Sequence, residues 1–316
     1  MDLATLSSSP ATTSKAPMSL LVIGTLAYDT VETPFDRRER ALGGSAVYFA
    51  MAASAFGPVR MAGIVGEDFA ASDLELLRAR GVDTQGIEHA KGESFHWGGS
   101  YAPDWNTRTT LFTRLNVLEQ FHPKLPKSYC ESHYVFLANA EPAVQLEALA
   151  QCSQRKFVVA DTMNFWIDKY LPDLKRVLRE VDGIVLNDEE ARMLAGETNL
   201  IRAARKVLSM GPRYVVLKKG EHGAFLIGRD AHFSLPAYPV DQVIDPTGAG
   251  DCFAGGFMAA IAEADNTEPR TLRRAMLYGT VTASYCVQGF SIEDIGRRKR
   301  PEIEARFQEL LQITTV

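Results

Sequence analysis

The sequence predicts an α/β fold with a mostly parallel central sheet. Short apolar runs that end at glycine or at a polar residue are typical of buried parallel strands, and stretches with helical periodicity separate them. Such runs occupy residues 19–24, 59–66, 133–138, 183–186 and 213–218. The alternation of strand and helix implies right-handed crossovers. With 316 residues, of which 46% are hydrophobic, the chain suits one large domain.

Composition narrows the classes of protein. A formal net charge of -5 argues against a general nucleic-acid binder. The four cysteines include no Cys-x-x-Cys pair, so we expect no zinc site or disulfide framework and a reducing, cytoplasmic setting. No apolar run reaches the ~18 residues of a membrane span. Residues 1–17, rich in Ser, Thr, Ala and Pro, favour a disordered tail over a transit peptide, which leaves a folded domain over 18–316.

The first strand leads to a candidate ligand contact. Asp29 follows residues 19–24 and lies just past the carboxyl end of that strand, where open α/β sheets bind ligands. Its carboxylate could accept hydrogen bonds from substrate hydroxyls, or it could simply stabilise the turn. The polar residues 32–40 that follow predict an exposed excursion.

A glycine pair opens the first helix. Gly43 and Gly44 precede an Ala-rich stretch within residues 42–57, so backbone amides at the start of this helix point toward the cleft. Tyr48 lies in the same stretch. It either packs within the helix layer or presents its hydroxyl or ring to a ligand.

Residues 88–121 differ in character from the rest of the chain. Aromatic and polar residues alternate there, which predicts short strands, and Pro103 with Asp104 interrupts them. Asn106 and Arg108 are candidate substrate contacts in this segment. The alternative is a solvated hairpin face.

Polar side chains also follow the later strands. Glu141 comes after one of them and could bridge to substrate or to metal-bound water, or favour a helix start by its charge. Asn187 and Glu190 stand one helical turn apart, a spacing that also forms a capping box. Lys219 begins a tight turn over residues 219–223 and could reach a nucleotide phosphate.

The stretch IDPTGAGDCFAGGFMAA at residues 244–260 predicts a loop that leads into a helix N-terminus. The unpaired N–H groups and the positive dipole end of such a terminus form an anion site, which Gly248, Ala249 and Gly250 leave open to close approach. Asp251 beside it supplies a base for a hydroxyl, so the pair suits phosphoryl transfer to an alcohol. The alternative is an acid that compensates the dipole of an ordinary helix start.

The motif DPTGAGDCFAGGF closely resembles the C-terminal signature of the PfkB/ribokinase family of carbohydrate and nucleoside kinases. The pair Gly43 and Gly44 resembles the N-terminal signature of that family, although Tyr48 stands where an asparagine is usual. Asn187 and Glu190 match the N-x-x-E motif of the family.

The resemblance covers about residues 19–312 in the family's motif order and implies an architecture. We expect a ribokinase-like three-layer α/β/α fold with a small β-lid, formed by segments at about 30–42 and 92–118. Lids of this kind often dimerise, so a homodimer through the lid is expected. The implied cofactors are ATP, Mg²⁺ and, as a further option, K⁺.

The resemblance also assigns roles to residues. The catalytic base would be Asp251, with an anion hole formed by Gly248, Ala249 and Gly250. The expected acceptor contacts are Asp29, Gly43, Gly44, Tyr48, Asn106, Arg108 and Glu141. The expected ATP contacts are Asn187, Lys219, Gly220, Gly223, Thr247, Gly248 and Gly250. Mg²⁺ would be held through water by Glu190 and Asn187. A monovalent cation would be held by Asp245, Thr247 and Gly289.

These expectations lead to a functional hypothesis. The protein would be an ATP-dependent phosphotransferase acting on a hydroxymethyl group of a small sugar-containing acceptor. One alternative is a ribonucleoside kinase with an acceptor like adenosine, guanosine, inosine or cytidine. A second is a non-catalytic relative that senses its ligand. Neither nucleic acid nor membrane is an expected partner.

Overall fold

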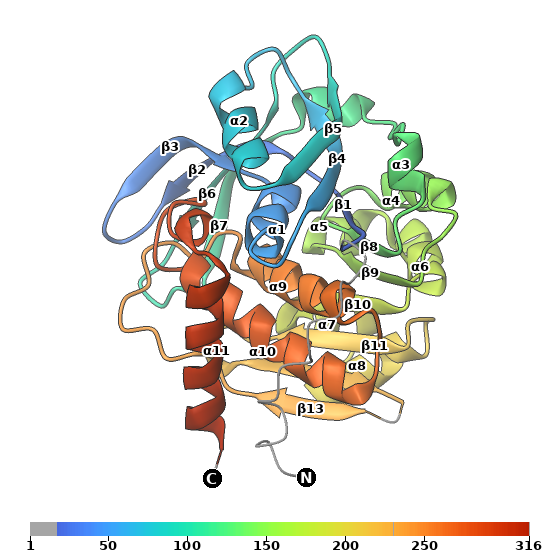
Figure 1. Cartoon of the computed structure of the whole chain (residues 1–316), viewed down its shortest axis with the longest axis vertical. Coiled ribbons are helices and arrows are strands. Elements are labelled where there is room, and N and C mark those ends of the chain that lie inside the picture. Colours follow the sequence, from blue (N-terminus) through green and yellow to red (C-terminus); the bar gives the residue numbers. More distant parts are fainter. Residues whose placement is uncertain (1–17, 230, 316) are drawn as a thin grey trace.

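A nine-stranded, mostly parallel sheet forms the centre of the protein (Figure 1). The computed structural model describes residues 18–229 and 231–315, so the expected tail at 1–17 lies outside the described residues. The strand order is β13-β12-β11-β10-β9-β8-β1-β4-β5, in which β12 and β13 at one edge are antiparallel. Its strands are β1 (Leu20–Ile23), β4 (Val59–Val65), β5 (Val82–His89), β8 (Tyr134–Leu137), β9 (Phe157–Asp161), β10 (Gly183–Asn187), β11 (Tyr214–Lys218), β12 (Ala224–Gly228) and β13 (His232–Leu235).

Helices cover both faces of this sheet. One face carries α1 (Ser45–Ala53), α2 (Ala71–Ala79), α9 (Ala249–Ala264), α10 (Pro269–Cys286) and α11 (Arg300–Thr314). The other carries α3 (Lys127–Cys130), α4 (Pro142–Gln151), α5 (Asn164–Lys169), α6 (Leu171–Glu180), α7 (Asp188–Ala195) and α8 (Leu200–Leu208). Alternation along each strand feeds both layers: in β1, Leu20 and Val22 join one core, and Leu21 and Ile23 join the other. The structure thus confirms the predicted three-layer α/β/α fold.

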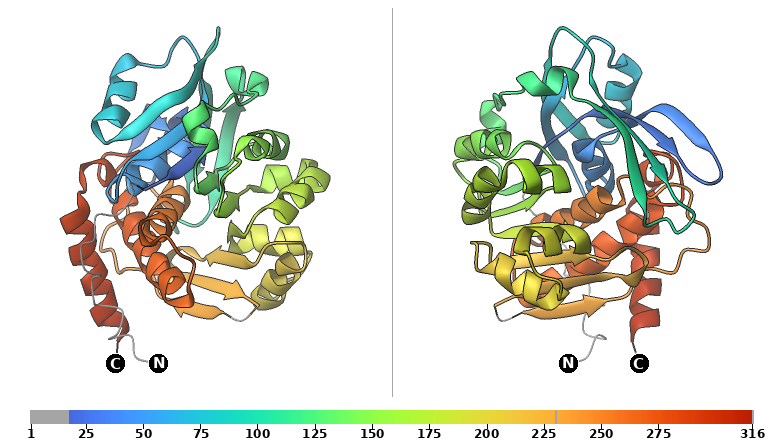
Figure 2. Two further views of the ribbon diagram at one scale, coloured as in Figure 1. Left: turned by 45° about the vertical axis from the view of Figure 1, so that its right-hand side comes forward. Right: turned by 180° about the vertical axis from the view of Figure 1, so that it is seen from behind.

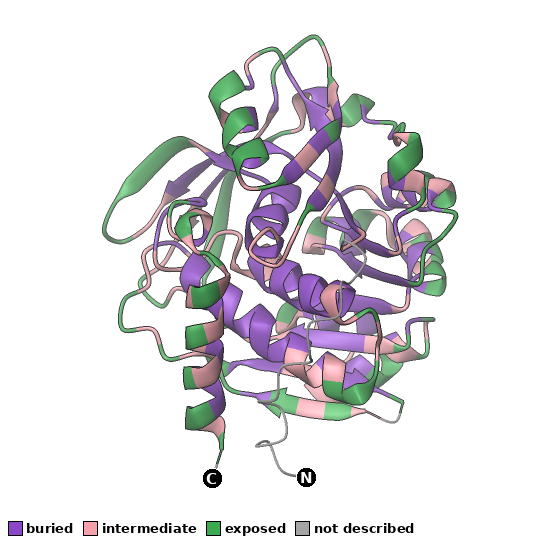
Figure 3. Cartoon of the chain, in the orientation of Figure 1, coloured by how far each residue is buried: buried purple, intermediate pink, exposed green. Residues whose placement is uncertain are grey.

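Two helices next to the sheet are buried almost completely. Every residue of α1 is buried, as is the run Cys252–Ala262 of α9 (Figure 3). Both helices are therefore apolar around their circumference, as expected for interior helices. This burial explains the apolar run after the 244–251 loop. The packing of this run against the sheet holds the start of α9 in place.

A separate four-stranded sheet stands beside the central one (Figures 1 and 2). Its order is β3-β2-β6-β7, with β2 (Ala27–Glu32), β3 (Arg37–Gly43), β6 (Phe95–Tyr101) and β7 (Arg108–Arg114). The excursion expected at 32–40 is instead the tip of the β2–β3 hairpin, whose exposed side chains gave it the polar pattern of a loop. The sheet coincides closely with the segments expected to form a lid, and we call it the lid sheet below.

No helix in the described part of the chain is long and apolar enough to cross a membrane.

Candidate active site

The loop before α9 presents free backbone donors. Gly248 caps the helix with a φ of 76°, and the Asp245 carboxylate accepts the Thr247 N–H at 2.8 Å. Within the described chain, no hydrogen-bond acceptor is paired with the backbone N–H of Gly248, Gly250 or Asp251. Three unpaired donors at a helix N-terminus form a site for an anionic group.

Tyr48 forms the floor of this loop. A Cβ atom added to Gly248 would lie 2.3 Å from the Tyr48 ring, so the ring is in close contact with the glycine. Tyr48 is only 2% exposed, and its buried hydroxyl has no partner among the described residues. Burial, together with Asp29 and Asp245, raises the pKa of this hydroxyl, so it remains a neutral donor. Both alternatives for Tyr48 therefore have support: the ring packs, and the hydroxyl is available.

Asp251 lies in the first turn of α9 beside the free donors. Burial raises the pKa of its carboxyl well above the usual range, and the nearby Asp161 carboxylate adds to this effect. The positive charge of Lys218 acts in the opposite direction. The carboxylate is thus a stronger base than an exposed aspartate, which suits proton abstraction from a hydroxyl.

The carboxyl ends of three parallel strands bring further charges to this point. Asp161 ends β9 and Lys218 ends β11, and the Lys218 Nζ lies 3.4 Å from the Asp161 Oδ2. These side chains are 18% exposed for Lys218 and 6% exposed for Asp161. Between them in the sheet is β10, which ends at Asn187. The resemblance assigned no role to Lys218, and its only signal in the sequence was its place at the end of a strand.

Asn187 and Glu190 form the capping box of α7. The Asn187 side chain accepts the Glu190 N–H at 2.8 Å, and the Glu190 carboxylate accepts the Asn187 N–H at 2.8 Å. Glu190 is also buried at 8% exposure, and burial raises its pKa to about 7, against the opposing charges of Lys218 and Arg108. The pair therefore stabilises the helix start. Glu190 also interacts with Lys218 and Asp161, and together with Asp251 we call these side chains the charge cluster.

Asp29 of β2, Gly43 at the end of β3 and Gly44 at the start of α1 lie together where the lid sheet meets α1. The Asp29 carboxylate accepts a hydrogen bond from the Gly44 N–H, and a Cβ atom on Gly43 would lie 2.0 Å from its Oδ2. Only glycine therefore fits at position 43. Asp29 is 5% exposed, and burial, with the Asp245 charge second, raises its pKa to about 7.

The raised pKa of Asp29 predicts a pH-dependent stability. Because the folded-state pKa of about 7 lies above the ordinary value of 3.8, ionised Asp29 destabilises the fold. Asp29→Asn should melt at a higher temperature than the wild type, by a margin that grows between pH 4 and pH 7 and is constant above. Each pKa unit of this shift changes the free energy of unfolding by about 1.4 kcal/mol. Thermal unfolding from pH 5 to 8 measures it, with Asp36→Asn in the exposed β2–β3 turn as the control. Parallel curves for wild type and Asp29→Asn would contradict the prediction.

The lid sheet reaches the loop at residues 244–250, called the anion loop below, and the turn after β11. The Thr247 hydroxyl donates to the Tyr101 hydroxyl of β6 at 3.2 Å, a contact that the sequence did not suggest. A Cβ atom on Gly220 would lie 2.9 Å from the Asn106 side chain at the tip of the β6–β7 hairpin. The Arg108 guanidinium lies 5.5 Å from the centre of the Trp97 ring, and its charge lowers the pKa of Glu190. The end of the lid sheet at Tyr101 and Asn106 therefore lies against the loop before α9 and the turn after β11.

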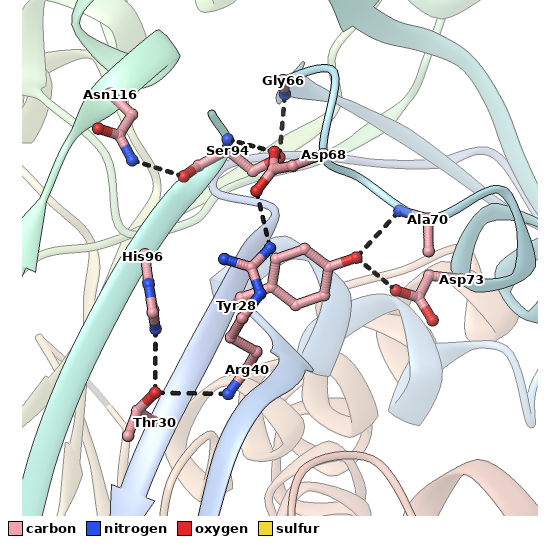
Figure 4. Close-up of polar contacts among 10 residues, drawn as sticks. All are labelled: Tyr28, Thr30, Arg40, Gly66, Asp68, Ala70, Asp73, Ser94, His96 and Asn116. Atoms are coloured by element: carbon pink, nitrogen blue, oxygen red, sulfur yellow. Dashed lines mark hydrogen bonds and ion pairs between the residues drawn. The ribbon is translucent and has the colours of Figure 1, made fainter. Parts of the chain in front are cut away.

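A polar network fixes the base of the lid sheet (Figure 4). Asp68 accepts the N–H and hydroxyl of Ser94 at 2.7 and 2.8 Å and pairs with Arg40 at 2.8 Å. The Tyr28 hydroxyl donates to Asp73 at the start of α2, at 2.8 Å. Asn116 donates to the Ser94 carbonyl at 2.9 Å. This network joins β2, β3 and β6 to the loop before α2, so the sheet is anchored at its base.

The remaining expected residues make local contacts and do not form a cluster of their own. The Lys219 ammonium lies 4.1 Å from the centre of the Phe225 ring and contacts its own turn through the His222 carbonyl at 3.4 Å. Glu141 occupies the N-cap position of α4 without a capping hydrogen bond from its side chain, and Gly289 follows the end of α10, with its N–H donated to the Cys286 carbonyl. At Gly223, φ is 81° and a Cβ would lie 2.1 Å from the Leu235 carbonyl, so this glycine serves the turn.

Asp245 is buried at 1% exposure beside the anion loop. Its two carboxylate oxygens accept the N–H groups of Thr247 at 2.8 Å and Ser291 at 3.4 Å. Burial raises its pKa, partly offset by these hydrogen bonds. Within the described chain, no group of three or more His, Cys, Asp or Glu side chains is arranged to hold a metal ion directly.

Comparison with known proteins assigns the chain to a family. The model of the pfkB family carbohydrate kinases covers residues 19–294. The chain belongs to the PfkB family. It is therefore a kinase of the carbohydrate and nucleoside type, and ATP use follows from the family.

Relatives in this family include kinases of nucleosides and of sugars. The chain is 28% identical to the cytidine kinase of Thermococcus kodakarensis over 77% of this chain and 88% of that one. It is 25% identical to the ribokinase of Bacillus subtilis over 90% of this chain and 98% of that one. Sequence similarity alone thus leaves both acceptor classes open.

Solved structures confirm the ribokinase-like fold. The nucleoside kinase of Burkholderia thailandensis with inosine has a TM-score of 0.75 at 22% identity and covers 92% of this chain and 98% of that one. A putative ribokinase II of E. coli in complex with ATP and Mg²⁺ has a TM-score of 0.75 at 19% identity, covering 92% of this chain and 99% of that one.

Proposed function

We propose that this PfkB-family kinase transfers the terminal phosphoryl group of ATP to a hydroxymethyl group of a neutral ribonucleoside. The observation that carries the transfer chemistry is the juxtaposition of the Asp251 carboxylate with the unpaired N–H groups of Gly248 and Gly250. A base and an anion site within one helical turn supply what a hydroxyl and a phosphoryl group need. A ligand-sensing relative would have no use for this pair.

The excess of negative charge at the candidate site favours a neutral acceptor over a sugar phosphate. Its carboxylates are those of Asp29, Asp161, Glu190, Asp245 and Asp251. Within the described chain, the cationic side chains that act on them are Lys218 and Arg108. Arg114 is the other arginine near the lid tip in sequence. Its guanidinium lies over the Phe112 ring, and its charge lowers the pKa of His96. An acceptor that brought its own phosphate would meet excess negative charge.

The nucleoside class is supported by the relatives and by the lid sheet. The similar proteins include a cytidine kinase and a nucleoside kinase whose structure contains inosine. Trp97 and Tyr101 of β6 and the unpartnered Tyr48 hydroxyl offer flat rings and a donor near Asp29. A neutral sugar is the second candidate, favoured by the match to ribokinase over 90% of the chain.

In the proposed mechanism, each group of the chain has one task. Asp29 and Gly44 orient the acceptor hydroxyls, and Asp251 takes the proton of the attacking hydroxyl. The N–H groups of Gly248 and Gly250 stabilise the charge that spreads over the transferring group. The lid sheet excludes water, because Tyr101 and Asn106 close the cleft against Thr247 and Gly220.

The residues present fit the cations that the family implies. Glu190 and Asn187 use part of their capacity on each other, so they would hold Mg²⁺ through water, which agrees with the reluctance of this ion to shed its waters. When bound, Mg²⁺ would neutralise phosphate charge. The buried Asp245 carboxylate has backbone donors and no cationic side chain as partner in the described chain, which supports K⁺ beside Thr247 and Gly289.

Two further proposals concern the setting of the protein. All four cysteines are free thiols, which supports a reducing compartment such as the cytoplasm. The lid sheet ends at the exposed strands β3 and β7, with Leu111 48% exposed, which supports a homodimer through this sheet.

An acceptor panel tests the proposed function. ADP release from Mg-ATP is measured with nucleosides, free sugars and sugar phosphates at equal concentrations. We expect the highest kcat/KM for a nucleoside and little turnover of any sugar phosphate. Preference for a free sugar would mean that Trp97 and Tyr101 serve packing and lid closure and do not recognise a base. Preference for a sugar phosphate would contradict the charge argument, and ATP binding without turnover of any acceptor would favour a ligand sensor.

A further inference from the structure

Two cysteine side chains face each other beneath the anion loop. Cys252 lies in the first turn of α9, and Cys286 is the last residue of α10. Both side chains are buried, and the Cys286 thiol makes a side-chain hydrogen bond with the Cys252 thiol. Neither sulfur has a task in the proposed mechanism, so the pair is available for other chemistry.

The backbones of α9 and α10 bring the same two residues together. The Thr282 hydroxyl, one helical turn before Cys286, donates to the Cys252 carbonyl at 2.7 Å. Because residues four apart share one face of a helix, Cys286 lies on the face of α10 that meets Cys252. The contact between the sulfurs is therefore a consequence of how the two helices pack.

Each thiol also contacts a part of the candidate active site. The Cys286 Sγ lies 3.5 Å from the Thr247 carbonyl oxygen, which belongs to the anion loop. The Cys252 Sγ lies 3.4 Å from the carbonyl oxygen of Tyr48, whose ring packs against Gly248. A change in the position of either sulfur therefore reaches the loop that presents the free N–H groups.

We propose that Cys252 and Cys286 form a redox-sensitive modification site, at which a hydroperoxide converts the two thiols into a disulfide and reversibly inactivates the kinase. The oxidant must be small and uncharged, as hydrogen peroxide is, because both thiols are buried. Buried thiols react through local opening of the structure, and the anion loop is a segment that contacts this pair. The modification does not depend on the acceptor, but the loss of turnover rests on the proposed function of the loop.

The oxidation consumes one molecule of hydrogen peroxide. The contact with Cys252 and burial raise the pKa of the Cys286 thiol, so Cys252 is the sulfur that attacks first. Its thiolate forms a bond to one peroxide oxygen, the O–O bond breaks, and hydroxide departs, which leaves a sulfenic acid on Cys252. The Cys286 sulfur then attacks this sulfur, the S–O bond breaks, and a second hydroxide departs. The protons of the two thiols convert both hydroxides to water, and the two electrons lost by the sulfurs reduce the peroxide.

Formation of the disulfide must displace the anion loop. An S–S bond of about 2.05 Å is shorter than any hydrogen bond between two thiols, so the sulfurs have to approach each other. The helices cannot follow as rigid bodies, because a Cβ atom on Gly256 of α9 would already lie 2.7 Å from the Tyr278 carbonyl oxygen of α10. The movement therefore falls on the helix ends, where Gly248 begins α9 and the Val287 carbonyl accepts the Ile244 N–H at 2.7 Å. The free N–H groups are then no longer aimed at one anion.

The test treats the reduced full-length protein with hydrogen peroxide and follows ADP release from Mg-ATP with an acceptor that the protein phosphorylates. Turnover should fall by at least about 10², because loss of one anion-hole donor alone costs a factor of about that size. Peptide mass spectrometry after blocking of the free thiols should find a disulfide between Cys252 and Cys286. Dithiothreitol should restore turnover by thiol–disulfide exchange.

Single variants separate this pair from the other cysteines. Cys286→Ser should keep the turnover of the reduced wild type, because its hydroxyl can donate to the Thr247 carbonyl, and it should resist inactivation by peroxide. Cys252→Ser should resist in the same way, so the test does not depend on the folding of one variant. Cys130→Ser is the control. Cys130 ends α3 on the other face of the central sheet, so this variant should be inactivated as the wild type is.

Four results overturn the inference. They are inactivation that persists in Cys286→Ser and Cys252→Ser, inactivation that dithiothreitol does not reverse, no disulfide between these two cysteines, and full turnover once that disulfide is complete. If the reduced wild type phosphorylates no acceptor, the proposed function has failed. Disulfide mapping and the affinity for Mg-ATP before and after oxidation, measured by calorimetry, then still decide whether the modification forms and disturbs the loop.

Discussion

Asp251→Asn should lower kcat by about 10² to 10⁴ while ATP still binds, because a positioned base contributes a factor of that size. The asparagine keeps the size of the side chain and loses its capacity to take a proton. Steady-state turnover with saturating acceptor measures the effect, and calorimetry with Mg-ATP checks binding.

The stability of this variant distinguishes a catalytic from a structural aspartate. Burial raises the pKa of Asp251, so the ionised carboxylate costs free energy in the folded state. Asp251→Asn should therefore melt at or above the wild-type temperature at pH 8. Asp265→Asn, at the C-terminal end of the same helix and paired with Lys156, is the matched control and should keep its turnover. Turnover of Asp251→Asn within tenfold of the wild type would remove this residue from the mechanism.

Gly248→Ala should lower kcat by at least about 10² and destabilise the fold, because it disturbs the anion loop. The new Cβ would lie 2.3 Å from the Tyr48 ring, on a residue with a φ of 76°. The left-handed backbone costs about 1–2 kcal/mol for a non-glycine residue. The clash adds about 1–3 kcal/mol, as overpacking of a close-packed site does.

Gly81→Ala measures the backbone term alone, so its difference from Gly248→Ala gives the cost of the clash. Gly81 has a similar φ of 81°, but a Cβ there would have nothing within 4 Å, so only the backbone strain applies. Chemical denaturation of both variants gives the difference in free energy of unfolding. In a double-mutant cycle, Gly248→Ala should cost less in a Tyr48→Ala background than in the wild type, although Tyr48→Ala itself destabilises the core. Equal destabilisation of Gly248→Ala and Gly81→Ala would show that the ring does not restrict the loop.

Local patterns in the sequence determined most of the fold. The apolar runs at 19–24, 59–66, 133–138, 183–186 and 213–218 each coincide with a strand of the central sheet, because a strand buried on both faces needs a continuous apolar run. The composition of residues 32–40 predicted only an exposed excursion, and the lid segment at about 30–42 came from the resemblance. The side chains from Arg37 to Arg40 are exposed, so they have the composition of a loop while the backbone pairs with β2.

The sequence by itself determined the helix start of α9 and the capping box of α7. Both depend on residues a few positions apart, whose geometry follows from the backbone of a loop and one helical turn. Asp251 and Glu190 could therefore be named as candidates, and their proposed roles now await the variants above.

Only the tertiary structure decided which partners the two adjacent lysines have and what packs against the loop before α9. Lys218 and Lys219 are adjacent in sequence, yet one contacts Asp161 and the other lies over Phe225. The Tyr48 ring beneath Gly248, 200 residues away, and the contact of Tyr101 with Thr247 depend likewise on how α1 and the lid sheet pack against α9 and its loop. Side-chain direction at a strand end and contacts between distant segments are set by packing, which no local pattern of residues records.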